Sequence, residues 1–114
     1  MPNIESSRDI IIRTSKWPEA LRFYEEVLGF TVSSREEGLV GFETGAFCLY
    51  VEAGQPHGPV FDFLVADVTA TKARLIAAGC TLVEEDPSVP RCYLRDPFGV
   101  VFNVGRISAS PPSV

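Results

Sequence analysis

The chain has 114 residues, a formal net charge of −5 at pH 7 and a hydrophobic content of 46%. This length is typical of one domain, and the composition excludes a disordered chain. Phosphate binding requires clustered lysine and arginine, so the acidic balance also argues against nucleic acid as a partner.

The cysteines and the N-terminus indicate the compartment. Cys48, Cys80 and Cys92 are odd in number and lack a C-x-x-C spacing, so we expect free, buried thiols rather than disulfides or structural zinc. The opening MPNIESSRD lacks the charged-then-apolar pattern of a signal peptide. No apolar run reaches the roughly 20 residues needed to cross a bilayer. We therefore expect a cytoplasmic protein without a membrane partner.

The first half of the chain predicts a strand, a helix and three more strands. The β-branched run 9–14 precedes a helix at 15–29, which Ser15 can cap and Gly29 can end, with Pro18 in its first turn. One face of this helix carries Ala20, Leu21, Tyr24, Val27 and Leu28. Short glycine-containing gaps then predict antiparallel hairpins between strands at 30–34, 39–43 and 46–52.

The second half repeats this order. After a connector at 54–59 come a strand at 60–66, a helix at 67–79 capped by Asp67 and ended by Gly79, and strands at 80–85, 91–95 and 99–104. The segment GFTV at 29–32 recurs as GCTL at 79–82. We interpret the chain as a βαβββ unit that occurs twice, with modules at about 8–53 and 60–106 and a flexible tail at 107–114.

The last strand raises a question about one amide. Asp96, Pro97 and Gly99 fit a type I turn, and the apolar run that follows is interrupted by Asn103. A buried amide must find partners or lose roughly 1–3 kcal/mol of unmet hydrogen bonding. We therefore expect Asn103 to have a specific role.

Strand alternation places the polar side chains on one shared surface. Successive strand residues face opposite sides, so if Ile10 and Ile12 face the helix, Asp9 and Arg13 face away from it. Two such curled sheets would enclose a cavity of mixed lining, which is the usual form of a small-molecule site. The candidate ligand-binding residues are Asp9, Arg13, Tyr50, Glu52, Asp62, Arg91, Tyr93 and Asn103.

Three segments carry a family resemblance. ALRFYEEVLGF at 20–30, DVTATKARLIAAG at 67–79 and DPFG at 96–99 resemble the vicinal oxygen chelate superfamily, which includes glyoxalases, extradiol dioxygenases and bleomycin-resistance proteins. The resemblance covers nearly all of residues 8–105. It implies an α+β fold in which two βαβββ modules form U-shaped mixed sheets, usually paired in a homodimer.

The resemblance also implies where a metal would be held. The enzymes of the superfamily use a histidine or glutamine on each module's first strand and a glutamate on each last strand. The matching positions here are Asp9, Val60, Glu52 and Asn103. Valine offers no donor and a neutral amide is a poor ligand, so we expect no metal cofactor. If a divalent ion is bound, its candidate ligands are Asp9, Glu52 and His57.

Two functions follow from these residues. The first is metal-independent binding of a flat cationic or amide-rich small molecule, as in bleomycin-resistance proteins. The second is a divalent-metal-dependent lyase, isomerase or dioxygenase with an atypical ligand set, and a regulatory dimer is a third interpretation. Glu52 is the candidate general base, unless it pairs with Arg13 or Arg91. Asp62 either faces a ligand or pairs with Arg13.

Overall fold

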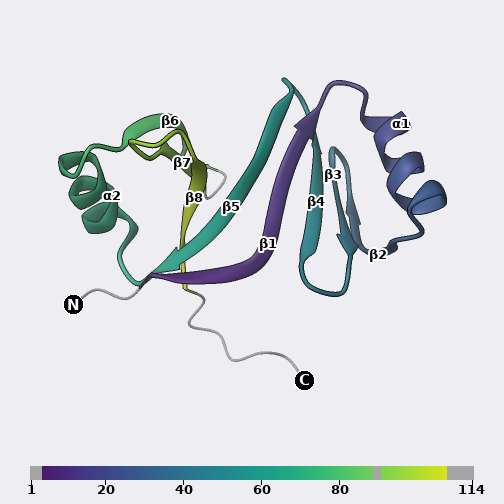
Figure 1. Cartoon of the computed structure of the whole chain (residues 1–114), viewed down its shortest axis with the longest axis horizontal. Coiled ribbons are helices and arrows are strands. Elements are labelled where there is room, and N and C mark those ends of the chain that lie inside the picture. Colours follow the sequence, from purple (N-terminus) through teal and green to yellow (C-terminus); the bar gives the residue numbers. More distant parts are fainter. Residues whose placement is uncertain (1–3, 89–90, 108–114) are drawn as a thin grey trace. The chain divides into compact units, whose positions relative to one another are not determined.

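The computed structural model describes residues 4–88 and 91–107, and the chain divides into two compact units. The N-terminal unit comprises Arg8–Phe61, and the C-terminal unit comprises Met1–Ser7 together with Asp62–Val114. Figure 1 follows the elements along the chain. Each unit combines strands with a helical segment, so the predicted α+β fold of two βαβββ modules is confirmed. Among the helices of the described residues, none has the length and apolar character to cross a membrane.

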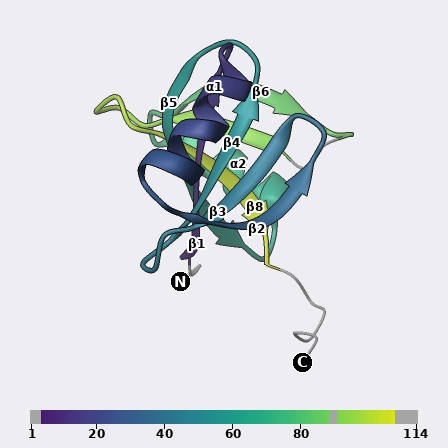
Figure 2. The same cartoon turned by 90° about the vertical axis from the view of Figure 1, so that its right-hand side faces the viewer.

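The N-terminal unit is a mixed sheet with one helical segment over it. Its strands follow the order β2-β3-β4-β1, with β1 parallel to β4 and the other pairs antiparallel. The helix α1 lies over this sheet (Figure 2). The elements are β1 (Glu5–Thr14), α1 (Trp17–Arg22), the π-helical segment η1 (Phe23–Val27), β2 (Thr31–Glu36), β3 (Leu39–Glu43) and β4 (Cys48–Ala53).

The core of this unit lies between the sheet and α1. Leu49 and Val51 are buried there, and Ile12 packs against them, which confirms the predicted alternation of both strands. The indole Nε1 of Trp17 donates a hydrogen bond of 2.9 Å to the carbonyl oxygen of Val51. Phe42 belongs to the same cluster. Trp17 and Phe42 are therefore structural residues of the core.

The helix begins differently from the prediction. Pro18 does lie in its first turn, but no side chain caps the N-terminus, so the predicted cap by Ser15 is wrong. Instead the backbone N–H of Lys16 donates to the hydroxyl of Thr14 at 3.1 Å. That hydroxyl stabilises the turn that leads from β1 into the helix.

The end of the helix also differs, because its last part is a π-helix. The N–H of Leu28 donates to the carbonyl of Phe23 at 3.0 Å, which is the wider spacing of a π-turn. The wider turn rotates the following residues off the buried face. Val27 and Leu28 were expected in the core but are 68% and 48% exposed. Gly29 ends the segment with a φ of +75°, as predicted.

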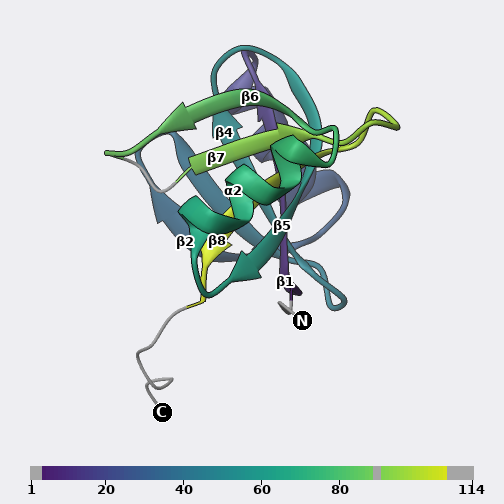
Figure 3. The same cartoon turned by 90° about the vertical axis from the view of Figure 1, so that its left-hand side faces the viewer.

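The C-terminal unit repeats the plan. Its strands follow the order β5-β8-β7-β6, with β5 entering this unit at Asp62, and α2 lies across β7 and β8 (Figure 3). The elements are β5 (His57–Val65), α2 (Val68–Ala77), β6 (Thr81–Asp86), β7 (Arg91–Arg95) and β8 (Val101–Arg106). β5 begins inside the stretch predicted as a connector. The prediction was wrong there because Gly58 and Pro59 are residues that usually mark turns rather than strands.

The helix α2 and the core beneath it match the sequence closely. The carboxylate of Asp67 accepts the N–H of Ala70 at 3.0 Å, so the predicted N-cap is confirmed. Cys80 and Cys92 are free and buried in the core beside Leu94 and Phe102. Burial raises the pKa of both thiols. Of the predicted tail 107–114, only Ile107 lies within the described residues, and its N–H donates to Val65 at 2.9 Å.

The duplication extends to an irregularity in each sheet. The β2–β3 pairing shifts register between Val32 and Ser34, and the β6–β7 pairing shifts between Leu82 and Glu84, at positions fifty residues later. β2 and β6 each lie at an end of the strand order, and bulges at edge strands hinder unwanted pairing with other chains. The shared bulge supports the interpretation of two copies of one unit.

Gly41 provides a test of the packing of β3. A Cβ at this position would lie 2.8 Å from Ser34 Oγ and 2.9 Å from Tyr50 Cε1, so one of these side chains would have to move. We expect Gly41→Ala to lower the free energy of unfolding by about 1–3 kcal/mol in urea denaturation. The control is Gly58→Ala, whose Cβ would meet nothing within 4 Å and should change stability by less than about 0.5 kcal/mol. Equal losses in the two variants would contradict the packing described.

Candidate functional site

The open face of each unit, meaning the sheet face away from its helix, carries the polar residues singled out by sequence. In the N-terminal unit these are Asp9, Arg13, Tyr50 and Glu52, because their strand neighbours face α1. The parallel register places Asp9 beside Cys48 and Arg13 beside Glu52. These residues therefore form a row along β1 and β4.

Glu52 is held by an ion pair. The Nε of Arg13 donates to Glu52 Oε1 at 3.0 Å, and the two side chains are 13% and 20% exposed. A ligand on this face therefore meets an ion pair rather than a lone carboxylate. The structure thus supports the ion-pair alternative for Glu52, with Arg13 as the partner rather than Arg91.

The candidate metal ligands of this unit are not brought together. Asp9 lies opposite Cys48, four residues before Glu52 along β4, which is a separation of about 13 Å along the strands. Oxygen ligands of a divalent ion must each lie within about 2.6 Å of it, so these two carboxylates cannot share one. The third candidate, His57, lies at the start of β5 with its Nδ1 2.9 Å from the carbonyl oxygen of Gly58.

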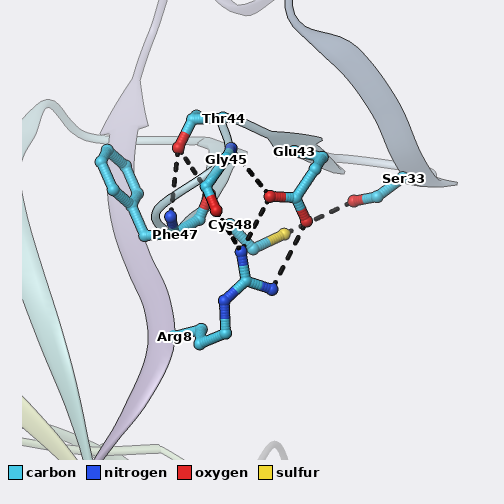
Figure 4. A network of polar contacts seen from close by, with 7 residues as sticks. All are labelled: Arg8, Ser33, Glu43, Thr44, Gly45, Phe47 and Cys48. Atoms are coloured by element: carbon cyan, nitrogen blue, oxygen red, sulfur yellow. Dashed lines mark hydrogen bonds and ion pairs between the residues drawn. The ribbon is translucent and has the colours of Figure 1, made fainter.

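Hydroxyl and thiol groups surround Tyr50. Burial, with the nearby Asp9 carboxylate and the Cys48 thiol, raises the pKa of the Tyr50 phenol, so it remains a neutral hydrogen-bonding group at physiological pH. Cys48 Sγ in turn lies 3.4 Å from Ser33 Oγ (Figure 4). Cys48 was not predicted as a site residue, although strand alternation places it on the open face.

A surface ion pair lies beside this cluster. Arg8 Nη2 donates to Glu43 Oε2 at 2.8 Å and to the carbonyl oxygen of Gly45 at 3.1 Å (Figure 4). The Arg8 guanidinium holds the pKa of the Glu43 carboxyl below its usual range. Both side chains are well exposed, so water and salt screen the pair and it is a structural contact of the surface.

Asn103 is the central residue of the open face of the C-terminal unit. Its Oδ1 accepts the backbone N–H of Cys92 at 2.9 Å, and its Nδ2 donates to Asp62 Oδ1 at 2.9 Å. Both ends of the amide are therefore used. A carboxylate at position 103 would accept the same N–H but would repel Asp62, which explains why an amide interrupts this apolar strand.

Asp62 is a half-buried carboxylate whose hydrogen-bond donor is this neutral amide. Within residues 4–88 and 91–107, no lysine, arginine or histidine forms an ion pair with Asp62. Arg13, the partner considered from the sequence, binds Glu52 instead. Asp62 thus presents a negative charge that no side chain of the described part of the chain neutralises.

Arg91 and Tyr93 lie on the same face of β7 and interact with each other. The guanidinium carbon of Arg91 lies 5.3 Å from the centre of the Tyr93 ring, which is a cation–π contact. Arg91 Nη1 also donates to Glu84 Oε2 at 2.7 Å. Tyr93 is paired in register with Asn103, so its ring is close to the Asn103–Asp62 bond.

The donor set does not fit the divalent ion that the superfamily resemblance implies. Val60 is buried and offers no donor, and the Asn103 amide is occupied at both ends. Glu52 is neutralised by Arg13. In the described stretches of the chain, no group of three or more His, Cys, Asp or Glu side chains is arranged to hold a metal ion.

Comparison with known proteins gives the family. A family model described as a glyoxalase-like domain matches residues 9–105, so the chain belongs to the glyoxalase-like domain family. The resemblance read from the three sequence segments is thereby confirmed. No curated protein matches the sequence.

Solved structures agree on the fold. A glyoxalase/bleomycin resistance protein/dioxygenase superfamily member from Vibrio splendidus 12B01 matches with a TM-score of 0.63 and 17% identity, over 94% of this chain and 100% of that one. A hypothetical protein from Bacillus halodurans C-125 matches with a TM-score of 0.65 and 15% identity, over 97% and 99%. The Mn(II)-bound glyoxalase from Novosphingobium aromaticivorans matches with a TM-score of 0.63 and 17% identity, over 93% of this chain but 40% of that one. At these identities the likeness shows the fold alone.

The Asn103–Asp62 bond yields a prediction about pH. Asn103→Asp replaces the amide donor by a second carboxylate beside Asp62, so we expect a loss of about 1–3 kcal/mol in the free energy of unfolding at pH 7. Like-charge repulsion raises the pKa of such a pair above its value in the unfolded chain. The folded variant then binds protons more readily than the unfolded one, and stability should recover as the pH falls below about 5.

The control for this prediction exchanges the two groups. In the double variant Asp62→Asn with Asn103→Asp, an amide at 62 can donate to a carboxylate at 103, which still accepts the N–H of Cys92. We expect chemical denaturation to show most of the lost stability restored at pH 7. A double variant that is no more stable than Asn103→Asp would show that the bond is not the cause.

Proposed function

We propose that this chain captures a small organic cation on the open face of its C-terminal unit, with the Asp62 carboxylate as the binding group and without a metal ion. The observation that carries the proposal is the hydrogen bonding of Asp62. Its carboxylate accepts a bond of 2.9 Å from a neutral amide, and no cationic side chain of the described residues pairs with it. A ligand with an ammonium group would supply the missing charge.

The energetics favour such a ligand. A half-buried carboxylate has lost part of its hydration, and a charge-assisted hydrogen bond from an ammonium group offsets that loss better than a neutral donor does. Asn103 fixes one carboxylate oxygen, so the orientation of Asp62 is set before a ligand arrives. The net charge of −5 also favours the approach of a cation.

Other charged groups of the two open faces are already engaged. The guanidinium of Arg91 lies 5.3 Å from the centre of the Tyr93 ring and donates to Glu84. Glu52, an acid on the open face of the N-terminal unit, is neutralised by Arg13 and offers no comparable charge. We therefore assign recognition to the C-terminal unit.

The relatives are compatible with binding as well as with catalysis. The matched proteins include a Mn(II)-bound glyoxalase, and the superfamily to which the matched Vibrio splendidus protein belongs includes bleomycin resistance proteins. The residues of this chain that match the metal-binding positions lack a fitting donor set, which favours capture over metal-dependent turnover. The proposal includes a cytoplasmic homodimer, the assembly that the superfamily resemblance implies.

Titration with benzylammonium tests the binding group. We expect isothermal titration calorimetry to show saturable binding of benzylammonium and much weaker binding of the neutral benzyl alcohol. Asp62→Asn should weaken benzylammonium binding by at least about tenfold, since the charge-assisted bond is lost. Glu5→Gln removes an exposed carboxylate of the same unit and should leave the affinity unchanged. Equal affinity of the wild type and Asp62→Asn would contradict the proposal.

A metal titration tests the other half of the proposal. Thermal unfolding of the protein, purified without a metal-affinity column, should show no stabilisation by Mn²⁺, Ni²⁺, Zn²⁺ or Mg²⁺, because the donor set does not fit. Elemental analysis that finds a stoichiometric transition metal in the same preparation would overturn metal independence. It would favour the metal-dependent lyase, isomerase or dioxygenase considered from the sequence.

A further inference from the structure

The C-terminal unit contains a second cavity, on the face of its sheet that α2 covers. The cavity has a volume of about 180 Å³ and is lined by residues of α2, β6, β7 and β8. Val68, Cys92 and Val104 on its wall belong to the helix-side core cluster, whereas Asp62 and Asn103 lie on the open face. The cavity is therefore separate from the proposed cation site.

The apolar part of the cavity suits a single ring. Cys92 and Val104 are each 3% exposed, so they form a fixed wall rather than a mobile surface. A cavity of roughly 150 Å³ lined by apolar side chains accommodates benzene, so 180 Å³ has room for one ring with a small substituent. Drug-sized ligands need larger pockets, of at least about 300 Å³. The cavity is thus of fragment size.

The charged groups on the wall are engaged by neighbours, with one exception. Both carboxylate oxygens of Glu85 accept from Lys72 Nζ at 2.9 Å. Arg91 binds Glu84 at 2.7 Å, and Asp86 Oδ1 accepts from the backbone and hydroxyl of Ser88 at 3.0 and 2.7 Å.

The exception is Arg106, the last residue of β8. No hydrogen bond or ion pair of its side chain is present among residues 4–88 and 91–107, and it is exposed at the rim. Arg106 is therefore the charged side chain of the lining that remains available to a ligand, although the chain as a whole is negative. A ligand that complements the site needs an apolar body and one negative group.

We propose that this cavity binds a small organic acid with a single-ring or branched apolar body, held by Val68, Cys92 and Val104, with its carboxylate on Arg106. Guanidinium and carboxylate match in geometry and can form two parallel hydrogen bonds, which gives direction as well as attraction. The apolar wall shields one side of the ring from water. The inference stands apart from the proposed function, because it rests on other residues and on the opposite ligand charge.

Benzoate is the probe for this site. In titrations followed by ¹⁵N–¹H NMR of the full chain, we expect saturable shifts at the backbone amides of Val68, Val104 and Gly105, which line the cavity. Benzamide, which has the same shape without the charge, should bind at least about tenfold more weakly. Arg106→Gln should weaken benzoate binding by a similar factor, and its exposed position should leave the fold intact.

Two matched variants complete the test. Arg95→Gln removes an exposed arginine of β7 that does not line the cavity, and benzoate affinity should be unchanged. Asp62→Asn should also leave benzoate affinity unchanged, which separates this site from the cation site. The proposal is overturned if benzamide binds as tightly as benzoate, if Arg106→Gln binds benzoate like the wild type, or if the shifts centre on Asp62 and Asn103. An absence of saturable shifts at millimolar benzoate overturns it as well.

Discussion

The amide of Asn103 is the constraint on which the chemistry of this protein depends. Its oxygen can only accept a hydrogen bond and its nitrogen can only donate, so it fits between the N–H of Cys92 and the carboxylate of Asp62. An unmet amide at this depth would cost about 1–3 kcal/mol. The same two bonds join β5, β7 and β8 through side chains and hold Asp62 in one orientation. Asn103 thus has two roles: it satisfies the backbone N–H of Cys92, and it fixes the position of the Asp62 charge.

The two units have kept one fold and acquired different charges. Both contain an edge bulge between equivalent residues, Val32/Ser34 and Leu82/Glu84, which shows how closely the sheets correspond. In the N-terminal unit an arginine on β1 neutralises the acid on β4. In the C-terminal unit a neutral amide on β8 holds the acid on β5, so its charge is retained. Because fold and chemistry vary separately, family membership defines the scaffold and the individual side chains define what it can bind.

Local rules predicted most of the fold, and they failed where the backbone left its usual geometry. The turn before β8 forms as expected, with Asp96 Oδ1 accepting the N–H groups of Phe98 and Val100 at 2.9 Å each. The strand at 39–43 also has its predicted bounds, since short alternating runs between glycines leave few alternatives. The positions of Val27 and Leu28 were wrong because a helical pattern assumes 3.6 residues per turn, and the π-helical segment does not follow it.

The sequence by itself determined which side chains share a face, because alternation along a strand is a property of neighbouring residues. It could not determine the partner of each polar group. Arg13 binds Glu52, and Asn103 rather than Arg13 binds Asp62, because the order and register of strands far apart in the chain set those distances. The same holds for the cavity at Arg106, whose wall comes from four elements that only tertiary packing brings together. The local sequence determined which polar side chains lie on each face, and the pairing of distant strands determined their partners.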